Sequence, residues 1–221
     1  MTELALFDLD NTLINGDSDH AWGIFLAEVG AVDAQQQIKA QDHFYQQYQS
    51  GTLDIHEFLA YQFTPLKNNS LEQLVSWRKQ YIESYIKPMI TQDRLDLVQQ
   101  HQQQGHTSII ITATNSFITR PIADLFGIKH LIATEPEQNI HGFTGKLDGL
   151  PCFQAGKITK LNAFLAENFS EKITLEDTNS WFYSDSHNDL PLLQTVNHAI
   201  AVTPDQKLRE YAKKHHWEII D

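Results

Sequence analysis

The chain has little cysteine, little positive charge and no long apolar run, and each shortage excludes a class of protein. Its 221 residues include one cysteine, Cys152, so an intrachain disulfide is impossible, which fits a reducing compartment. The 16 Lys and Arg residues are outnumbered by 28 Asp and Glu residues, which gives a net charge of −12. Because nucleic acids and anionic membranes attract basic surfaces, we expect neither as a partner.

Targeting and membrane signals are also missing. The N-terminal residues, MTELALFDLD, have no basic segment and no long apolar core, so we expect no signal peptide. No apolar run approaches the roughly 20 residues that a membrane-spanning helix needs. We therefore predict a soluble cytoplasmic protein. We expect it to be a monomer or a homodimer. Its length is sufficient for one domain with an insertion.

The segment from residue 18 to about 86 has helical signals throughout. Trp22, Phe25 and Val29 recur at helical spacing, and Asp54 can cap a later helix. Pro88 closes this block.

After Pro88, predicted strands alternate with predicted helices. The strands are expected at 107–112, 130–134, 181–184, 198–202 and 217–220, with a short hairpin inside 143–153 and helices over 92–104, 157–167, 188–195 and 205–215. Such alternation predicts an α/β fold with a parallel sheet that is covered on both faces. We expect residues 1–14 and 88–221 to form this core, and residues 15–87 to form a helical insertion.

The segment FDLDNTL, residues 7–13, places two carboxylates at the end of the first predicted strand. Side chains alternate along a strand, so Asp8 and Asp10 can point the same way. Two like charges this close repel each other and are costly to bury. A bound cation or a chemical role would account for the pair.

Other chemically capable residues fall at the ends of later strands or the start of a helix. They are Thr112, Lys157, Asp185 and Asp189. In a parallel sheet these positions gather at the carboxyl edge. Carboxylates suit Mg²⁺, one of them can attack phosphorus, and Thr112 and Lys157 can donate hydrogen bonds to phosphoryl oxygens.

Four segments in order resemble the motifs of the haloacid dehalogenase-like phosphatases. They are FDLDNTL, IIITATN (109–115), Gly156-Lys157 and YSDSHNDLPLL (183–193). Phrases such as ATNSFITRPIA and GKLDGLPCF resemble subfamily IB more narrowly, near phosphoserine phosphatases and bacterial histidinol-phosphate phosphatases. The resemblance covers nearly the whole chain. It implies a Rossmann-like three-layer core with an inserted helical C1 cap.

The resemblance also implies a role for each acid. Asp8 would be the nucleophile and a Mg²⁺ ligand. Asp10 would act as general acid and then as base, and its backbone carbonyl would bind the metal. Asp185 would bind Mg²⁺ directly, and Asp189 through water or as a supporting residue. Ser184 stands in a fourth motif that is richer in glycine in many relatives.

The remaining expected site residues contact the substrate. Thr112 and Lys157 would hold the phosphoryl group, and Lys157 would also neutralise Asp8. Thr114 competes with Thr112, but Thr112 directly ends the apolar run; Lys160 competes with Lys157, but only Lys157 lies at the helix start. Asn188 is a further expected substrate contact.

Asp17 has two open interpretations. It lies where the related phosphoserine phosphatases place an acid that meets the substrate's amino group, and it can equally cap the helix that follows.

These features predict a Mg²⁺-dependent phosphomonoesterase that acts on a small, amine-bearing ester. Histidinol phosphate is the favoured substrate, and phosphoserine is the second choice. Binding the carboxylate of phosphoserine would require an arginine, and residues 15–87 contain only one, Arg78. Two other hypotheses are a non-enzymatic aspartyl-phosphate acceptor and a dehalogenase. The insertion and the acids at 185 and 189 oppose the first, and Asp10 with the metal acids opposes the second.

Overall fold

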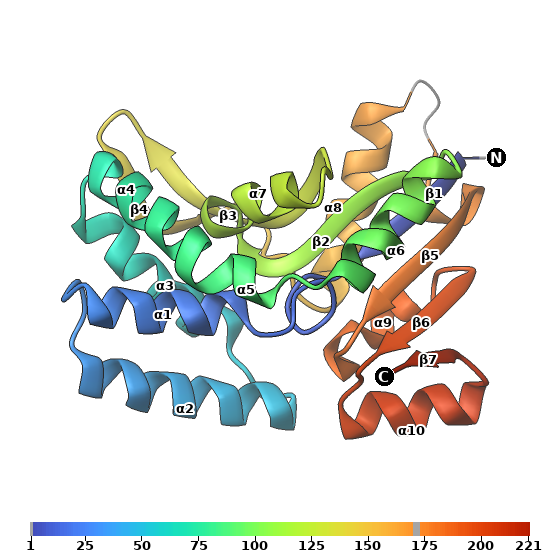
Figure 1. Cartoon of the computed structure of the whole chain (residues 1–221), viewed down its shortest axis with the longest axis horizontal. Helices are drawn as coiled ribbons and strands as arrows, with labels where there is room; N and C mark the ends of the chain where they lie inside the picture. Colours follow the sequence, from blue (N-terminus) through green and yellow to red (C-terminus); the bar gives the residue numbers. More distant parts are fainter. Residues whose placement is uncertain (1, 170–172) are drawn as a thin grey trace.

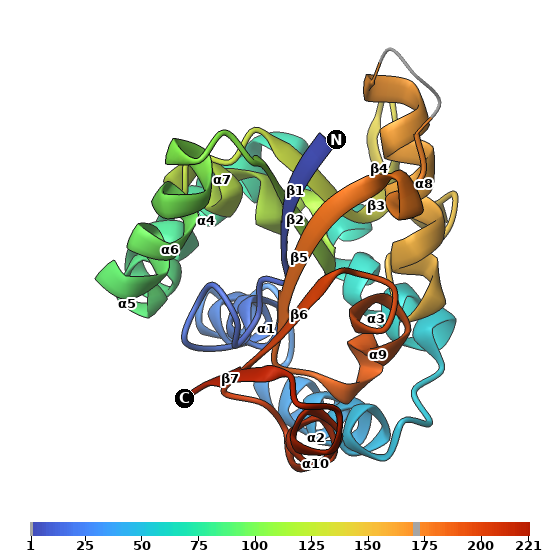
Figure 2. The same cartoon turned by 90° about the vertical axis from the view of Figure 1, so that its right-hand side faces the viewer.

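A twisted, mainly parallel β-sheet forms the centre of the molecule (Figures 1 and 2). The computed structural model describes residues 2–169 and 173–221. Within them the sheet has the order β4-β3-β2-β1-β5-β6-β7, and every neighbouring pair is parallel except β3 and β4. The strands are β1 (Thr2–Phe7), β2 (Thr107–Asn115), β3 (His130–Asn139), β4 (Gly142–Asp148), β5 (Thr178–Ser184), β6 (His198–Val202) and β7 (Glu218–Ile220).

Helices cover both faces of this sheet (Figure 2). The helices are α1 (Ser18–Glu28), α2 (Ala34–Ser50), α3 (Ile55–Asn68), α4 (Leu71–Tyr81), α5 (Lys87–Met89), α6 (Gln92–Gln103), α7 (Ser116–Leu125), α8 (Ala155–Asn168), α9 (Leu190–Leu193) and α10 (Gln206–His215), with a π-helical turn at Ile82–Ile86 and 3₁₀ turns at Leu175–Asp177 and His187–Asp189. No helix of the described residues is long and apolar enough to cross a membrane.

Two apolar clusters separate the layers. Phe7 of β1 packs toward α6 and α7, whereas its neighbour Leu6 packs toward α8, α9 and α10. Both side chains are fully buried, because successive residues of a central strand point to opposite faces. The expected α/β fold with a parallel sheet between two helical layers is confirmed.

The segment between β1 and β2 is helical, as predicted. Trp22 and Phe25 of α1 are buried and share one apolar cluster with Phe117 of α7, so this segment packs directly on the sheet-bound helices. Asp54 caps α3 by accepting hydrogen bonds from the next N–H groups. Whether residues 15–87 form a separate cap domain stays a prediction.

Two predictions about strands were wrong. The hairpin expected inside 143–153 is instead formed by β3 and β4, with its turn at residues 140–141. Gly145 lies within β4 with φ +83°, so the expected segment contributes one strand of the hairpin and not its turn. The strand expected to end at Thr112 continues to Asn115, after a register shift between Ile111 and Asn115.

Candidate active site

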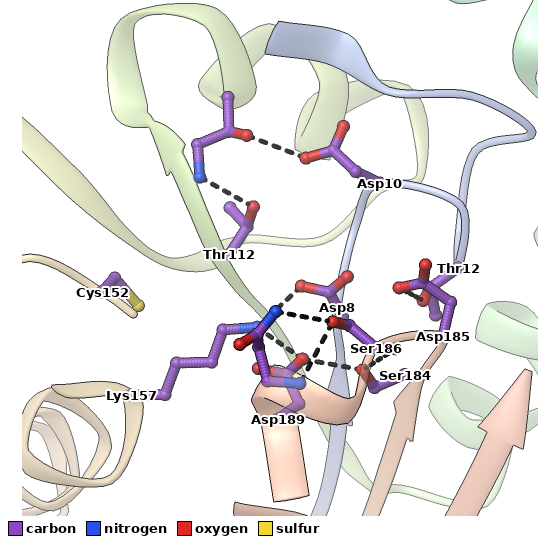
Figure 3. A network of polar contacts seen from close by, with 12 residues as sticks. Asp8, Asp10, Thr12, Thr112, Cys152, Lys157, Ser184, Asp185, Ser186 and Asp189 are labelled. Carbon is purple, nitrogen blue, oxygen red and sulfur yellow. Dashed lines mark hydrogen bonds and ion pairs between the residues drawn. The ribbon is translucent and has the colours of Figure 1, made fainter. Parts of the chain in front are cut away.

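The parallel sheet brings the predicted acids together at the carboxyl ends of β1 and β5 (Figure 3). Asp8 directly follows β1, and Asp185 directly follows β5, its neighbour in the sheet. Asp189 ends the 3₁₀ turn after β5, and Lys157 lies in the first turn of α8. Residues almost 180 positions apart in the sequence therefore share one site, as the topology predicted.

Lys157 is the electrostatic centre of this site. Its buried ammonium donates to Asp8 Oδ1 at 2.8 Å and to Asp189 Oδ2 at 2.7 Å. Ser184 Oγ also donates to Asp189 Oδ2, at 2.7 Å. Asp189 thus accepts hydrogen bonds from two donors and fixes the position of Lys157. Among the described residues, the hydrogen bond of the Lys160 ammonium goes to the carbonyl of Leu150, at 3.3 Å, and not to an acid of the site.

The balance of burial and neighbouring charges shifts the pKa values of both Asp8 and Lys157 upward. Burial raises the pKa of Asp8 to about 7, against the opposing charge of Lys157 and with reinforcement from Asp189 and Asp10. Burial alone would lower the pKa of Lys157, but Asp189 and Asp8 outweigh it and raise that pKa above its usual range. The ammonium is therefore charged at any physiological pH, whereas Asp8 titrates near neutrality when no further cation is bound.

Asp10 is held by two donors beside Asp8. The backbone N–H of Ser18 donates to Oδ1 at 2.6 Å, and Thr114 Oγ1 donates to Oδ2 at 2.8 Å. Burial, and next the charge of Asp17, raise the pKa of Asp10 to about 6. A carboxyl group with such a pKa can both donate and accept a proton near neutral pH.

The two threonines of β2 have different partners. Thr114 donates its hydroxyl proton to Asp10, while Thr112 Oγ1 accepts the backbone N–H of Thr114 at 3.1 Å. Both threonines line the same cavity as Asp8. The proton of Thr112 therefore remains available to a ligand, which favours Thr112 over Thr114 as a phosphoryl contact.

The donor set fits Mg²⁺ without forming a complete cage. Among the described residues, no three His, Cys, Asp or Glu side chains are arranged as a ready metal site. Asp185 is half-buried, and its Oδ1 is 3.5 Å from the hydroxyl of Thr12. Burial, and then Asp8 and Asp189, raise the pKa of Asp185 well above its usual range, so negative charge is crowded here. Mg²⁺ needs only one or two protein carboxylates, because it keeps waters and binds phosphate oxygens.

A cavity joins these acids to helices α2 and α3. Its walls include the predicted Asp8, Asp10, Asp17, Thr112, Lys157, Asp185, Asn188 and Asp189. Asp17 lies on the exposed rim and caps α1, with Oδ1 accepting the N–H groups of Asp19 and His20 at 2.9 and 2.8 Å. Asn188 is held by Gln154 Nε2 at 3.1 Å and lies 3.4 Å from the carbonyl of Tyr48.

Several cavity residues were not foreseen. The far wall is mainly aromatic and comes from α2, α3 and the loop before α8: Phe44, Tyr45, Tyr48, Phe58, Tyr61 and Phe153. Asp19 and Gln62 also line it. In the sequence these side chains look like ordinary helix positions, and only the repeated aromatic residues of the polar helix α2 offered a signal. Arg78, the one arginine of residues 15–87, is not among the lining residues, because it packs over the ring of Phe117 and donates to that residue's carbonyl at 2.6 Å.

The sequence pattern described as "haloacid dehalogenase-like hydrolase" matches residues 5–194, which include every residue of this site. The chain belongs to the haloacid dehalogenase-like hydrolase family. Family membership, and with it the expectation of an enzyme of the hydrolase class, is confirmed.

Within the family, the similarity extends over the full chain. A histidinol-phosphatase of Neisseria meningitidis serogroup C (strain 8013) is 44% identical over 222 residues, which cover 100% of this chain and 99% of that one. A crystal structure of a protein of unknown function from Bordetella pertussis Tohama I has a TM-score of 0.92 at 39% identity, covering 100% and 99% of the two chains. A phosphoserine phosphatase, solved as an analogue of its phospho-aspartyl intermediate, has a TM-score of 0.68 at 18% identity, covering 99% and 92%, and shares the fold.

Proposed function

We propose that this protein is a Mg²⁺-dependent phosphatase that hydrolyses a small, amine-bearing phosphate monoester in the cytoplasm, with histidinol phosphate as the favoured substrate. The observation that carries the proposal is the contact of Lys157 with both Asp8 and Asp189 beside a second buried acid, Asp10. This arrangement offers a nucleophile, a fixed positive charge and a proton donor within one cavity.

Asp8 is the nucleophile of this reaction. One of its carboxylate oxygens attacks phosphorus, the ester P–O bond breaks, and an aspartyl phosphate forms. Lys157 neutralises charge on Asp8 and the phosphoryl oxygens, because its ammonium already lies at hydrogen-bonding distance from Asp8. Thr112 holds a phosphoryl oxygen with its free hydroxyl proton.

Asp10 moves the protons. It gives its proton to the leaving alcohol in the first step, and as a carboxylate it takes a proton from the water that attacks the aspartyl phosphate. Phosphate then leaves and Asp8 is regenerated. The pKa of about 6 for Asp10 suits both roles near neutral pH.

Asp8, Asp185 and the backbone carbonyl of Asp10 would hold Mg²⁺. When bound, the ion neutralises the carboxylates and polarises the phosphoryl group. The crowding of Asp8 and Asp185 supports this assignment, because burial and then the charge of Asp8 raise the pKa of Asp185. Asp189 stays with Lys157 and Ser184.

The cavity walls favour histidinol phosphate over phosphoserine. Lys157 is the one lysine or arginine among the lining residues in the described part of the chain, and it is paired with two carboxylates. A substrate carboxylate would therefore meet no free positive charge, since Arg78 is engaged with Phe117. An aromatic wall with acids nearby suits an imidazole and an ammonium group. The 44% identity to a histidinol-phosphatase supports the same choice.

The test is phosphate release from a panel of monoesters with Mg²⁺ or with EDTA. Wild type, Asp8→Asn and the control Asp33→Asn are compared; Asp33 is an exposed cap of α2, outside the cavity, and asparagine caps helices equally well. We expect metal-dependent turnover, highest for histidinol phosphate, that is lost in Asp8→Asn and kept in Asp33→Asn.

The other hypotheses predict different outcomes. A non-enzymatic acceptor would incorporate labelled phosphate at Asp8 without turnover. A dehalogenase would release halide from a haloacid without needing Mg²⁺. Turnover that survives Asp8→Asn would disprove the nucleophile assignment.

A further inference from the structure

Asp19, in the first turn of α1, has an uncompensated oxygen beside the cavity. Its side chain is 7% exposed, and it belongs to the cavity wall. Oδ2 accepts a hydrogen bond from Gln62 Nε2 of α3, but Oδ1 is buried and has no hydrogen-bond partner among the described residues. Buried carboxylates are rare unless a cation or donor compensates them, so this position is unusual.

Two neighbouring acids add negative charge to the surroundings of Asp19. Burial, then Asp17 and Asp10, raise the pKa of Asp19 well above its usual range. The single lysine among the lining residues of the described chain, Lys157, is already held by Asp8 and Asp189. Nothing that the described chain supplies to this part of the cavity neutralises Asp19.

Aromatic rings complete the wall around this charge. Phe44 of α2 lies 5.2 Å from Phe58 and 5.6 Å from Tyr61 of α3, measured between ring centroids, and all three rings line the cavity. Gln62, the partner of Asp19, is the next residue after Tyr61. The faces of aromatic rings attract cations, as a carboxylate does, so the two features favour the same type of ligand.

We infer that Asp19 is the counter-ion for the positively charged group of the substrate, an ammonium or an imidazolium, and that Gln62 positions it. This inference rests on the proposed phosphatase function and extends it to a specificity residue. Asp17 is less suited to the role, because it is exposed at the rim and its Oδ1 is occupied in capping α1. Among the described residues Asp19 makes no hydrogen bond with Asp8, Asp10 or Lys157, so its role is to select the substrate and not to take part in bond making.

The test compares two phosphate monoesters in wild type and Asp19→Asn: histidinol phosphate, and propyl phosphate, whose alkyl group carries no positive charge. Asparagine keeps the size of the side chain and its hydrogen bond to Gln62 but removes the charge. We expect the ratio of kcat/KM for histidinol phosphate to that for propyl phosphate to fall about 10- to 100-fold, mainly through KM. The matched control is Glu57→Gln, an exposed acid on the same helix as Gln62, which should leave the ratio unchanged.

A second measurement needs no turnover. Calorimetric binding of histidinol itself should weaken about tenfold in Asp19→Asn, and in the smaller Asp19→Ser if asparagine disturbs folding. An unchanged ester ratio, an equal loss for both esters, or equal histidinol binding would overturn the inference. If wild type hydrolyses neither ester, the phosphatase proposal fails, while the histidinol titration still decides the role of Asp19.

Discussion

Tyr48 of α2 donates a hydrogen bond of 2.7 Å to Ser186, which lies 138 residues later in the loop after β5. At the same end of α2, the carbonyl of Gln49 accepts a hydrogen bond of 2.9 Å from the ammonium of Lys207 in α10. The first contact joins the helical insertion to the loop that carries Asp185 and Asp189, and the second joins it to α10. The insertion therefore encloses the cavity in this structure by specific polar contacts as well as by apolar packing.

Tyr48→Phe should weaken this closure. Loss of one hydrogen bond costs about 0.5–1.5 kcal/mol, so we expect kcat/KM for histidinol phosphate to fall roughly 2- to 12-fold. The control is Tyr211→Phe on α10, whose hydroxyl accepts from Gln194 and does not line the cavity. Equal activity of Tyr48→Phe and wild type would show that the contact does not contribute to closure.

Lys157→Met should destabilise the protein as well as inactivate it. It leaves Asp8 and Asp189 buried without their cation, which typically costs about 3–5 kcal/mol. Lys160→Met on the same helix should have little effect, because among the described residues the Lys160 ammonium donates to a carbonyl at 3.3 Å and not to an acid of the site. Denaturant unfolding and phosphate release measure both effects. If Lys160→Met is the inactive variant, the choice between the two lysines is wrong.

The pH dependence of this defect follows from the two freed carboxylates. Without Lys157 the folded-state pKa of Asp8 would rise further above its unfolded value, since Lys157 is what lowers it. At pH values between the unfolded-state and folded-state pKa of Asp8, the folded variant then binds more protons than the unfolded variant. The free energy of unfolding of the variant should therefore decrease as pH rises between these two pKa values. The loss of stability relative to wild type should thus be larger at pH 8 than at pH 5. A pH-independent loss would contradict the pairing as its cause.

Asp17 offers a test of capping alone. Asp17→Ala should lower the free energy of unfolding by about 1 kcal/mol, because α1 loses its N-cap, while Asp17→Asn should stay within a few tenths of wild type. Urea unfolding measures both. If Asp17→Asn also lowers kcat/KM for histidinol phosphate as strongly as Asp19→Asn, Asp17 shares the role of counter-ion.

His101 should reduce stability in acid. Its ring is buried between His106 and Tyr183, with nitrogens 2.8 Å from each, and burial, with the charge of His106, lowers its pKa to about 4 from 6.5. Because the unfolded state binds the proton more strongly, the contribution of His101 to stability should be lost as pH falls from about 6.5 to 4.

His101→Gln should remove that part of the pH dependence. The difference in free energy of unfolding between wild type and variant should shrink by up to about 3 kcal/mol on going from pH 7 to pH 4. The exposed His43→Gln serves as control, since its ring bonds only to Gln47 on the surface. Parallel pH profiles of wild type and His101→Gln would show that His101 does not titrate in this range.

The sequence alone was sufficient to predict that Asp8 and Asp185 lie at one edge of the sheet. Apolar runs ending in Asp8 and Asp185 predict parallel strands, and parallel strands put their carboxyl ends together, so those acids had to meet. Lys157 was expected at the same edge because it lies at the start of a helix, but the strand before that helix, β4, is antiparallel to β3, so the parallel-strand argument alone does not place it there. The positions of Asp8 and Asp185 depend on local periodicity and topology, which a single sequence carries.

Only the tertiary structure decided which residues line the rest of the cavity. Tyr48 meets Ser186, Asp19 meets Gln62, and Arg78 turns to Phe117, through side-chain packing between helices that no periodicity specifies. The β3–β4 hairpin was misplaced for a related reason, since the pairing of β4 with β3, and not the local sequence of residues 143–153, decides where the turn lies. The positions of Asp8 and Asp185 were thus predictable from sequence-local order, whereas the lining of the cavity depends on long-range contacts.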